Sequence, residues 1–135
     1  MVLLVDAEYT YLNPALNLFS LAMMLKCYTD RPLVYYTYQN YLKSTEHLLD
    51  RDINFIKSHG VGFAAKLVRG AYLEKERHLA KKNGYEDPVH PTFEDTTKTY
   101  TKSLNKMLDN IKMEPTKYAV VVATHNEDTV LYAVK

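Results

Sequence analysis

Four short apolar runs, each followed by a segment with helical spacing, constrain the fold of this chain more than any other feature. The runs cover residues 2–5, 33–38, 61–68 and 118–123, and they are rich in β-branched or aromatic residues. Their apolar residues are mostly continuous, which is typical of strands buried on both faces of a parallel sheet. The sequence therefore predicts four parallel strands connected by helices.

The first two connecting segments have clear helical signals. Asn13 followed by Pro14 places a capping residue before a proline at the first helical position, which predicts a helix to about residue 28. Its apolar positions run nearly all round, so we expect this helix to be well buried. The second predicted helix spans residues 40–59, has an apolar stripe that begins at Tyr41, and ends at Gly60.

Three further helices complete the pattern. Residues 74–83 form a short charged segment that Gly84 ends. Thr92 and Asp95 resemble a capping box, which predicts the start of a helix that continues to about residue 111. Asn126 is placed to cap a last, short helix after the fourth strand.

The predicted order β-α-β-α-β-α-α-β-α implies right-handed crossovers and a parallel sheet. A doubly wound open sheet usually has a glycine-rich turn after its first strand, but residues 6–10 read Asp-Ala-Glu-Tyr-Thr. A (β/α)₈ barrel needs no such turn and takes about 250 residues. We therefore predict a parallel TIM-like (β/α)₈ barrel. This chain, residues 1–135, would supply about four central βα units of it, and the barrel would be incomplete at both ends of the chain.

Composition excludes several classes of function. The 17 basic and 16 acidic side chains give a net charge of +1, so we expect no nucleic-acid partner. Cys27, the one cysteine, excludes an internal disulfide and a zinc site built from several cysteines. His47, His59, His78 and His90 have no spacing typical of metal ligands, so we interpret them as surface residues and predict no metal site.

Strong polar groups follow all four predicted strands. In a parallel barrel the C-terminal ends of the strands meet at one mouth, where active sites are built. A carboxylate, an amide, two cations, an imidazole and a hydroxyl would therefore face one ligand. The residues concerned are Asp6 and Glu8, then Thr37, Tyr38 and Gln39, then Lys66 and Arg69, and finally Thr124, His125 and Asn126.

Lys66 and Arg69 are the most informative members of this group. Lys66 lies inside an apolar strand, where a buried cation needs a partner or an anionic ligand. Arg69 precedes Gly70, and a glycine there lets a ligand approach the backbone closely. A Ser-His-Asp triad is not supported, because no serine lies on a nucleophile turn.

Several of these segments resemble the strand motifs of the proline dehydrogenase family. They are residues 5–8 (Val-Asp-Ala-Glu), 37–39 (Thr-Tyr-Gln), 66–72 (Lys-Leu-Val-Arg-Gly-Ala-Tyr) and 123–129 (Ala-Thr-His-Asn-Glu-Asp-Thr). Residues 84–88 and 91–92 also resemble the corresponding segments of this family. The likeness extends over the whole chain in order, and the third and fourth motifs are the most specific. The eukaryotic branch is the more similar one, which implies a mitochondrial location.

The resemblance implies a flavoenzyme that oxidises L-proline to Δ1-pyrroline-5-carboxylate with FAD and passes the electrons to quinone. Asp6 and Lys66 are then the expected catalytic residues. Asp6, Ala71 and Tyr72 would bind the substrate. The expected cofactor-binding residues are Gln39, Lys66, Arg69, Gly70, Ala71, Thr124 and His125.

Three alternatives remain open from the sequence. Hydroxyproline dehydrogenase shares the fold, the flavin and most motifs. A non-flavin barrel enzyme, such as an aldolase, would use Lys66 as a Schiff base. A catalytically incompetent fragment is the third, because the family's lysine and arginine pair for the substrate carboxylate would precede Met1 and follow Lys135. Those residues belong to barrel segments that the chain would need as partners.

Overall fold

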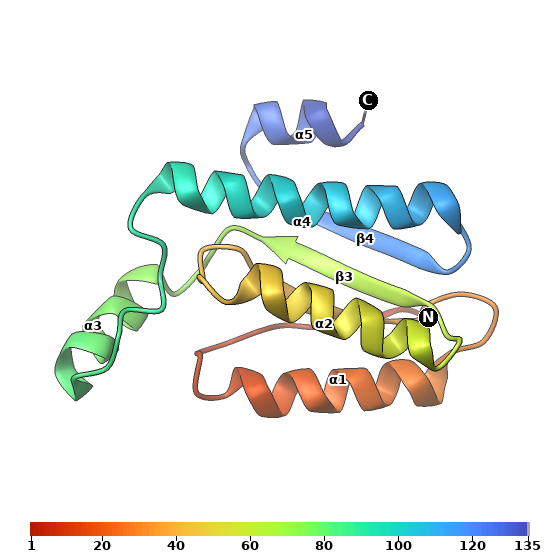
Figure 1. Cartoon of the computed structure of the whole chain (residues 1–135), viewed down its shortest axis with the longest axis horizontal. Helices are drawn as coiled ribbons and strands as arrows, with labels where there is room; N and C mark the ends of the chain where they lie inside the picture. Colours follow the sequence, from red (N-terminus) through yellow and green to blue (C-terminus); the bar gives the residue numbers. More distant parts are fainter. Residues whose placement is uncertain (135) are drawn as a thin grey trace.

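The chain forms one parallel sheet whose strands lie side by side in sequence order, β1-β2-β3-β4 (Figure 1). The computed structural model describes residues 1–134. The strands are β1 (Leu3–Val5), β2 (Val34–Gln39), β3 (Phe63–Val68) and β4 (Tyr118–Ala123), within two residues of the predicted bounds. A doubly wound sheet reverses its strand order at a switch point, whereas a barrel continues in one direction. The observed order is that of a barrel.

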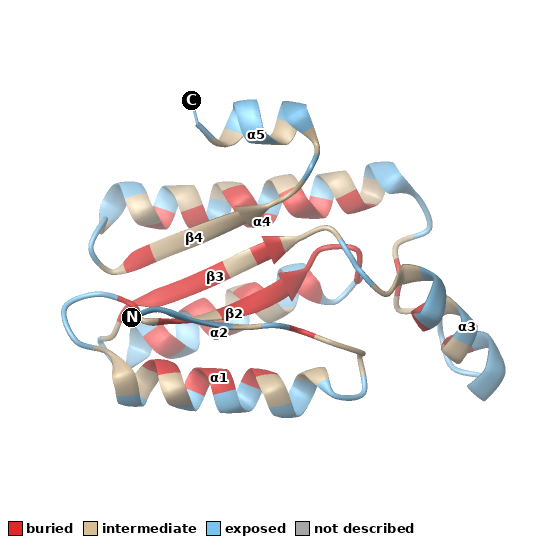
Figure 2. Cartoon of the chain, turned by 180° about the vertical axis from the view of Figure 1, so that it is seen from behind, coloured by how far each residue is buried: buried red, intermediate tan, exposed pale blue. Residues whose placement is uncertain are grey.

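Three helices cover the same face of this sheet. They are α1 (Asn13–Cys27), α2 (Thr45–Ser58) and α4 (Phe93–Met113), and Figure 2 shows the strands in front of them from the opposite side. The shorter helices α3 (Leu73–Asn83) and α5 (Glu127–Ala133) follow β3 and β4. Placing the helices on one face leaves the other face of the sheet for the interior of a barrel.

Successive side chains of each strand point to these two faces in turn, although the strand sequences are mostly continuous apolar runs. Tyr36 and Tyr38 of β2 and Phe63 and Leu67 of β3 belong to the core, which α4 completes with residues such as Tyr100. Because successive side chains of a strand point to opposite faces, Lys66 lies on the other face. The two faces therefore differ: one is the core, and the other leads to polar groups.

The second helix begins later than predicted. Residues 40–44 form a turn instead of a helical stripe, and α2 starts at Thr45. The backbone N–H groups of Asn40 and Tyr41 donate to Val68 and Arg69 carbonyl groups, at 2.8 and 2.7 Å, and so extend the pairing of β2 with β3. The prediction of a helix from residue 40 was wrong because this long-range pairing replaces the local helical bonds.

Helix α1 is much less buried than its apolar sequence predicts. Leu18 and Phe19 are 70% and 55% exposed, because α1 contacts the rest of the described chain along one side only. The prediction that Asn13 caps this helix was also wrong. Asn13 is the first helical residue, and its Oδ1 accepts the Glu8 backbone N–H at 2.8 Å.

Among residues 1–134, every helix is too short or too polar to span a membrane.

The other helix ends follow the predicted signals. Thr92 caps α4 by accepting the Asp95 N–H at 3.1 Å, and Asn126 caps α5 by accepting the Thr129 N–H at 2.9 Å. Gly84 ends α3 in the left-handed region with φ of 72°, a conformation that favours glycine. Local side-chain chemistry therefore determines these three boundaries.

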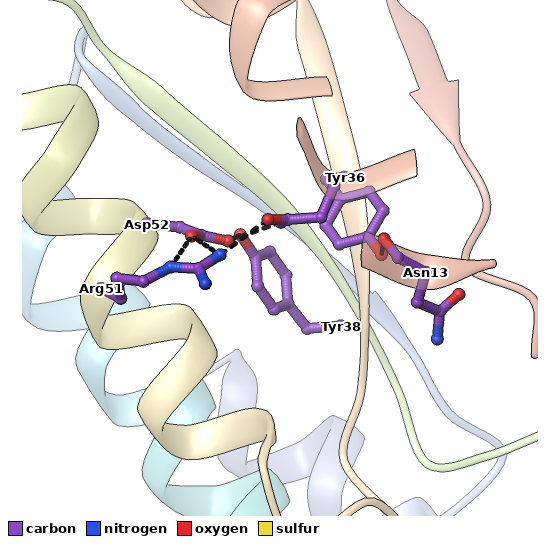
Figure 3. Close-up of polar contacts among 6 residues, drawn as sticks. Asn13, Tyr36, Tyr38, Arg51 and Asp52 are labelled. Atoms are coloured by element: carbon purple, nitrogen blue, oxygen red, sulfur yellow. Dashed lines mark hydrogen bonds and ion pairs between the residues drawn. The ribbon is translucent and has the colours of Figure 1, made fainter. Parts of the chain in front are cut away.

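A buried polar cluster joins α1, β2 and α2 on the core side of the sheet (Figure 3). Asp52 has no exposed area, and its Oδ2 accepts hydrogen bonds from Asn17 at 2.6 Å and from the Tyr38 hydroxyl at 2.8 Å. Its Oδ1 accepts two bonds from Arg51, at 2.7 and 2.9 Å. Burial, together with the Asp52 charge, raises the pKa of Tyr36 to about 12. The cluster fixes both helices to β2.

Candidate active site

Most of the polar residues at the ends of the four strands surround one cleft at the C-terminal edge of the sheet. Tyr38, which we also expected there, instead lies in the core and donates to Asp52. The cleft has a volume of about 570 Å³. Parallel strands bring these segments together because all their carboxyl ends lie at the same edge. The structure places all nine site residues expected from the sequence around it: Asp6, Gln39, Lys66, Arg69, Gly70, Ala71, Tyr72, Thr124 and His125.

Asp6 and Lys66 form an ion pair in this cleft. The Lys66 Nζ lies 2.6 Å from Asp6 Oδ1, and the Thr37 hydroxyl is 3.2 Å from the same oxygen. The hydrogen bond from Lys66 is the main reason that the pKa of Asp6 falls below its usual value. The Asp6 side chain is 68% exposed, so the carboxylate remains accessible to a ligand. Asp6, the residue directly after β1, is therefore the partner that Lys66 was expected to need within its apolar strand.

Arg69 is held by neutral groups. Its Nε, Nη1 and Nη2 donate to the hydroxyls of Thr124, Thr97 and Thr129, at 3.3, 2.9 and 2.9 Å. The guanidinium also lies 5.1 Å from the ring centroids of Phe93 and Tyr100. No carboxylate within residues 1–134 pairs with it. This positive charge at the wall of the cleft is well suited to an anionic ligand.

Gly70 is exposed at the cleft but packs against a side chain on its other side. A Cβ at this position would collide with the ring of Tyr41, which is buried in the turn after β2. The sequence suggested that the glycine admits a ligand, and the structure adds that it also admits this ring. An alanine at position 70 would have to displace a buried tyrosine.

Gln39 is buried and already engaged by the segment after β1. Its Nε2 donates to the Glu8 carbonyl at 3.0 Å, and its Oε1 accepts from Asn13 Nδ2 at 2.8 Å. Asn13 in turn accepts the Glu8 N–H. Gln39 and Asn13 together therefore fix the backbone after Asp6, a role for Asn13 that its capping signal concealed.

The segment after β4 contributes two different kinds of residue. Thr124 is half-buried, and its Oγ1 accepts from the Asn126 N–H at 3.1 Å as well as from Arg69. His125 is exposed and faces the same cleft. His90, in contrast, is not the surface residue that we predicted. It is half-buried, and its Nε2 lies 2.8 Å from the Thr99 hydroxyl.

Three supporting residues of the site were not found from the sequence. Thr97 and Thr129 hold Arg69, and Glu76 of α3 binds the segment after β1. In the sequence, each resembles an ordinary polar residue on the surface of a helix. Only the packing of α3, α4 and α5 around the cleft distinguishes them.

Comparisons with known proteins place these observations in a family. The family model described as proline dehydrogenase matches residues 1–135. Hydroxyproline dehydrogenase of Xenopus laevis is 50% identical over 131 residues, which cover 97% of this chain and 28% of that protein. The mitochondrial proline dehydrogenase 1 of Homo sapiens is 44% identical over 133 residues, which cover 98% of this chain and 22% of that protein. The chain thus spans about a quarter of the length of these relatives.

Solved structures show the same arrangement of elements. Proline utilization A of Bdellovibrio bacteriovorus superposes with a TM-score of 0.83 at 23% identity, over 98% of this chain and 14% of that one. A variant of the Bradyrhizobium japonicum protein gives a TM-score of 0.81 at 25% identity, over 99% and 14%. The prediction of a partial TIM-like barrel is confirmed. The family model and these relatives, together with the four motifs, show that the chain belongs to the proline dehydrogenase family.

Proposed function

We propose that this chain is the central part of the catalytic barrel of a proline dehydrogenase, incomplete at both ends. The complete protein would oxidise L-proline to Δ1-pyrroline-5-carboxylate and pass the electrons through FAD to quinone. The observation that supports this most strongly is the pairing of Asp6 with Lys66 beside the uncompensated charge of Arg69, in a cleft of this family's fold. A mitochondrial location is part of the proposal, because relatives such as the human protein are named mitochondrial.

The residues of the cleft fit a flavin nucleotide. FAD carries phosphate groups, and its ring becomes negatively charged near N1 on reduction, so it favours nearby cations. Lys66 and Arg69 would supply this charge, and the exposed Gly70 with Ala71 would let the backbone approach the cofactor. Gln39, Thr124 and His125 would complete the cofactor site. When bound, FAD supplies the acceptor for the hydride that leaves the substrate.

The chain's own residues would prepare the substrate. The pyrrolidine nitrogen must lose its proton before the ring can donate a hydride, and nearby positive charge favours that loss. Lys66 supplies such charge, while the accessible carboxylate of Asp6 orients Lys66 and the substrate amine. Ala71 and Tyr72 would form the wall against the ring. We interpret Asp6 as an orienting group and not as a simple base.

The ion pair argues against the aldolase alternative. A Schiff base requires Lys66 to attack a carbonyl as a neutral amine. In the structure its Nζ donates to Asp6 at 2.6 Å, so this ion pair would have to break before Lys66 could attack a carbonyl. Borohydride trapping with a carbonyl substrate would label Lys66 in an aldolase, and we expect no such labelling.

Hydroxyproline dehydrogenase is a second candidate. The specific observation in its favour is the 50% identity to the Xenopus laevis protein of that name. The two substrates differ by one hydroxyl, which a site recognises by a hydrogen bond to it. No described residue assigns that contact.

One experiment tests both candidates. The full-length protein is purified with its flavin, and turnover of L-proline and trans-4-hydroxy-L-proline is measured with an artificial quinone. Faster turnover of L-proline, with bleaching of the flavin absorbance, is the expected result. Preference for the hydroxylated substrate would assign the second function, and turnover of neither would overturn both.

A further inference from the structure

Glu76, on α3, is a fully buried carboxylate outside the cleft. Its side chain has no exposed area, and it is absent from the residues that line the cleft. Its Oε1 accepts the backbone N–H of Thr10 at 2.7 Å, and its Oε2 accepts the Thr10 hydroxyl, also at 2.7 Å. No lysine or arginine within residues 1–134 forms an ion pair with it.

These two bonds connect the segments that follow β1 and β3. Thr10 lies four residues after Asp6, in the connection between β1 and α1. Glu76 lies in the first turn of α3, which begins directly after residues 70–72. The neighbouring rings of Tyr9 and Tyr72 are also in contact, with centroids 4.8 Å apart. The segment with Asp6 is therefore fastened to the segment with Tyr72.

A third segment, the turn after β2, packs against residue 70. Tyr41, from the turn after β2, is buried, and its hydroxyl has no hydrogen-bond partner within the described chain. Burial, and then the charge of Glu76, raise the pKa of this hydroxyl well above its usual value. The ring of Tyr41 packs against Gly70, where a side chain would collide with it. The segment after β2 therefore packs against the segment that leads from β3 into α3.

Burying a carboxylate without a cation raises the free energy of the folded chain, because the charge loses its water. Two hydrogen bonds to one residue offset only part of this desolvation penalty. An apolar side chain at position 76 would bury α3 without this penalty. Unlike an apolar side chain, the Glu76 carboxylate makes directional bonds. It accepts both the N–H and the hydroxyl of Thr10 and so fixes the conformation of the loop between β1 and α1.

We propose that Glu76 is a positioning residue for the reaction in the neighbouring cleft. By holding Thr10, it sets the separation between Asp6, with its partner Lys66, and the Tyr72 wall. It touches neither substrate nor cofactor and acts through these residues. The inference rests on the proposed oxidation of an L-proline-type substrate.

The test uses the full-length, flavin-loaded protein and the variants Glu76→Gln, Thr10→Val and Thr10→Ser. Glutamine can accept the Thr10 N–H but lacks the second acceptor oxygen, and valine removes the hydroxyl at similar volume. We expect each to lower kcat/KM per bound flavin by about tenfold, the value of one charge-assisted hydrogen bond. Thr10→Ser keeps both donors and should retain the wild-type value.

The matched control is Glu74→Gln, because Glu74 is an exposed glutamate in the same helix. Glu76→Gln combined with Thr10→Val should lose little more than either change alone, since both break the same contact. Loss of flavin content or Tm with unchanged kcat/KM per flavin would show a merely structural role and overturn the inference. Wild-type protein that oxidises neither L-proline nor its hydroxylated analogue would instead overturn the proposed function.

Discussion

At the scale of single residues, the site depends on where charge is placed. Lys66 forms an ion pair with the Asp6 carboxylate, whereas Arg69 is bonded only to hydroxyls and lies near two aromatic rings. A cation without a carboxylate partner stays available to a ligand, and one with a partner positions that partner. The two cations of the cleft are thus suited to different tasks, which their equal charge in the sequence does not reveal.

Replacing Asp6 with asparagine tests its orienting role. Asparagine keeps the shape but loses the charge that binds Lys66. We expect kcat/KM for L-proline to fall by about tenfold, because neither Lys66 nor the substrate amine would then face a carboxylate. Steady-state kinetics per bound flavin measure the effect. Asp109→Asn, at an exposed carboxylate of α4 outside the cleft, is the control, and an Asp6→Asn enzyme with wild-type kinetics would contradict the assignment.

The pKa of His90 provides a prediction of pH dependence. Burial is the main reason that this pKa lies below 6.5 in the folded chain. The unfolded chain therefore binds a proton at His90 more readily, so stability should decrease as the pH falls from about 6.5 towards the folded pKa. Tm measured between pH 7.5 and 5.5 should fall less steeply in His90→Gln than in wild type. Equal slopes for His90→Gln and the wild type would contradict the prediction.

At the scale of elements, the long helices α1, α2 and α4 are fixed to the sheet by a few directional contacts in addition to apolar packing. The Asp52 cluster does this for α1 and α2, because one carboxylate accepts bonds from Asn17, Tyr38 and Arg51. For α4, Thr92 fixes the first turn and Tyr100 donates to the Leu67 carbonyl at 3.2 Å. Such contacts determine how each strand end, and therefore each site residue, is oriented.

Asp52→Ala tests this fixing of the two helices. The change leaves the buried Tyr38 hydroxyl and Asn17 amide without an acceptor, so we expect the free energy of unfolding to fall by about 3 kcal/mol. Chemical denaturation of the full-length protein measures it. Asp50→Ala is a matched control on the same helix, because it breaks only the partly exposed Asp50–Lys106 pair. That control should change stability by less than about 1 kcal/mol, and equal effects would contradict the prediction.

At the scale of the whole molecule, the four strands form an open arc. Within residues 1–134, β1 pairs only with β2 and β4 only with β3, so each has one free edge. Leu3 and Leu4 are nearly half exposed at one of these edges. Free strand edges and exposed apolar side chains favour association with further chain. In the complete barrel that we propose, further strands would pair with both edges.

The 135-residue chain expressed alone is therefore expected to self-associate and to bind FAD weakly. Sedimentation velocity should show species larger than a monomer, and proline should not bleach any bound flavin. The full-length protein is the control and should bind flavin tightly. A monomeric 135-residue chain whose flavin is reduced by proline would contradict this expectation.

Much of the fold could be predicted from the sequence because its signals are local. Apolar runs indicate the strands, and Thr92, Gly84 and Asn126 mark helix ends through their own hydrogen bonds or backbone conformation. The polar residues after the strands were also predictable, because parallel strands must bring their carboxyl ends to one edge. The order of elements and most members of the cleft therefore follow from the sequence, whereas Tyr38 was expected at the cleft and lies in the core.

What only the tertiary structure decided are the contacts between segments far apart in the chain. The turn at residues 40–44 replaces a predicted helix because β2 continues to pair with β3. The partner of Lys66, the hydroxyls around Arg69 and the acceptor of the Thr10 N–H each lie 28 or more residues away in sequence. A side chain's neighbours at such distances are determined by how the helices pack on the sheet, and periodicity along the chain does not specify that packing.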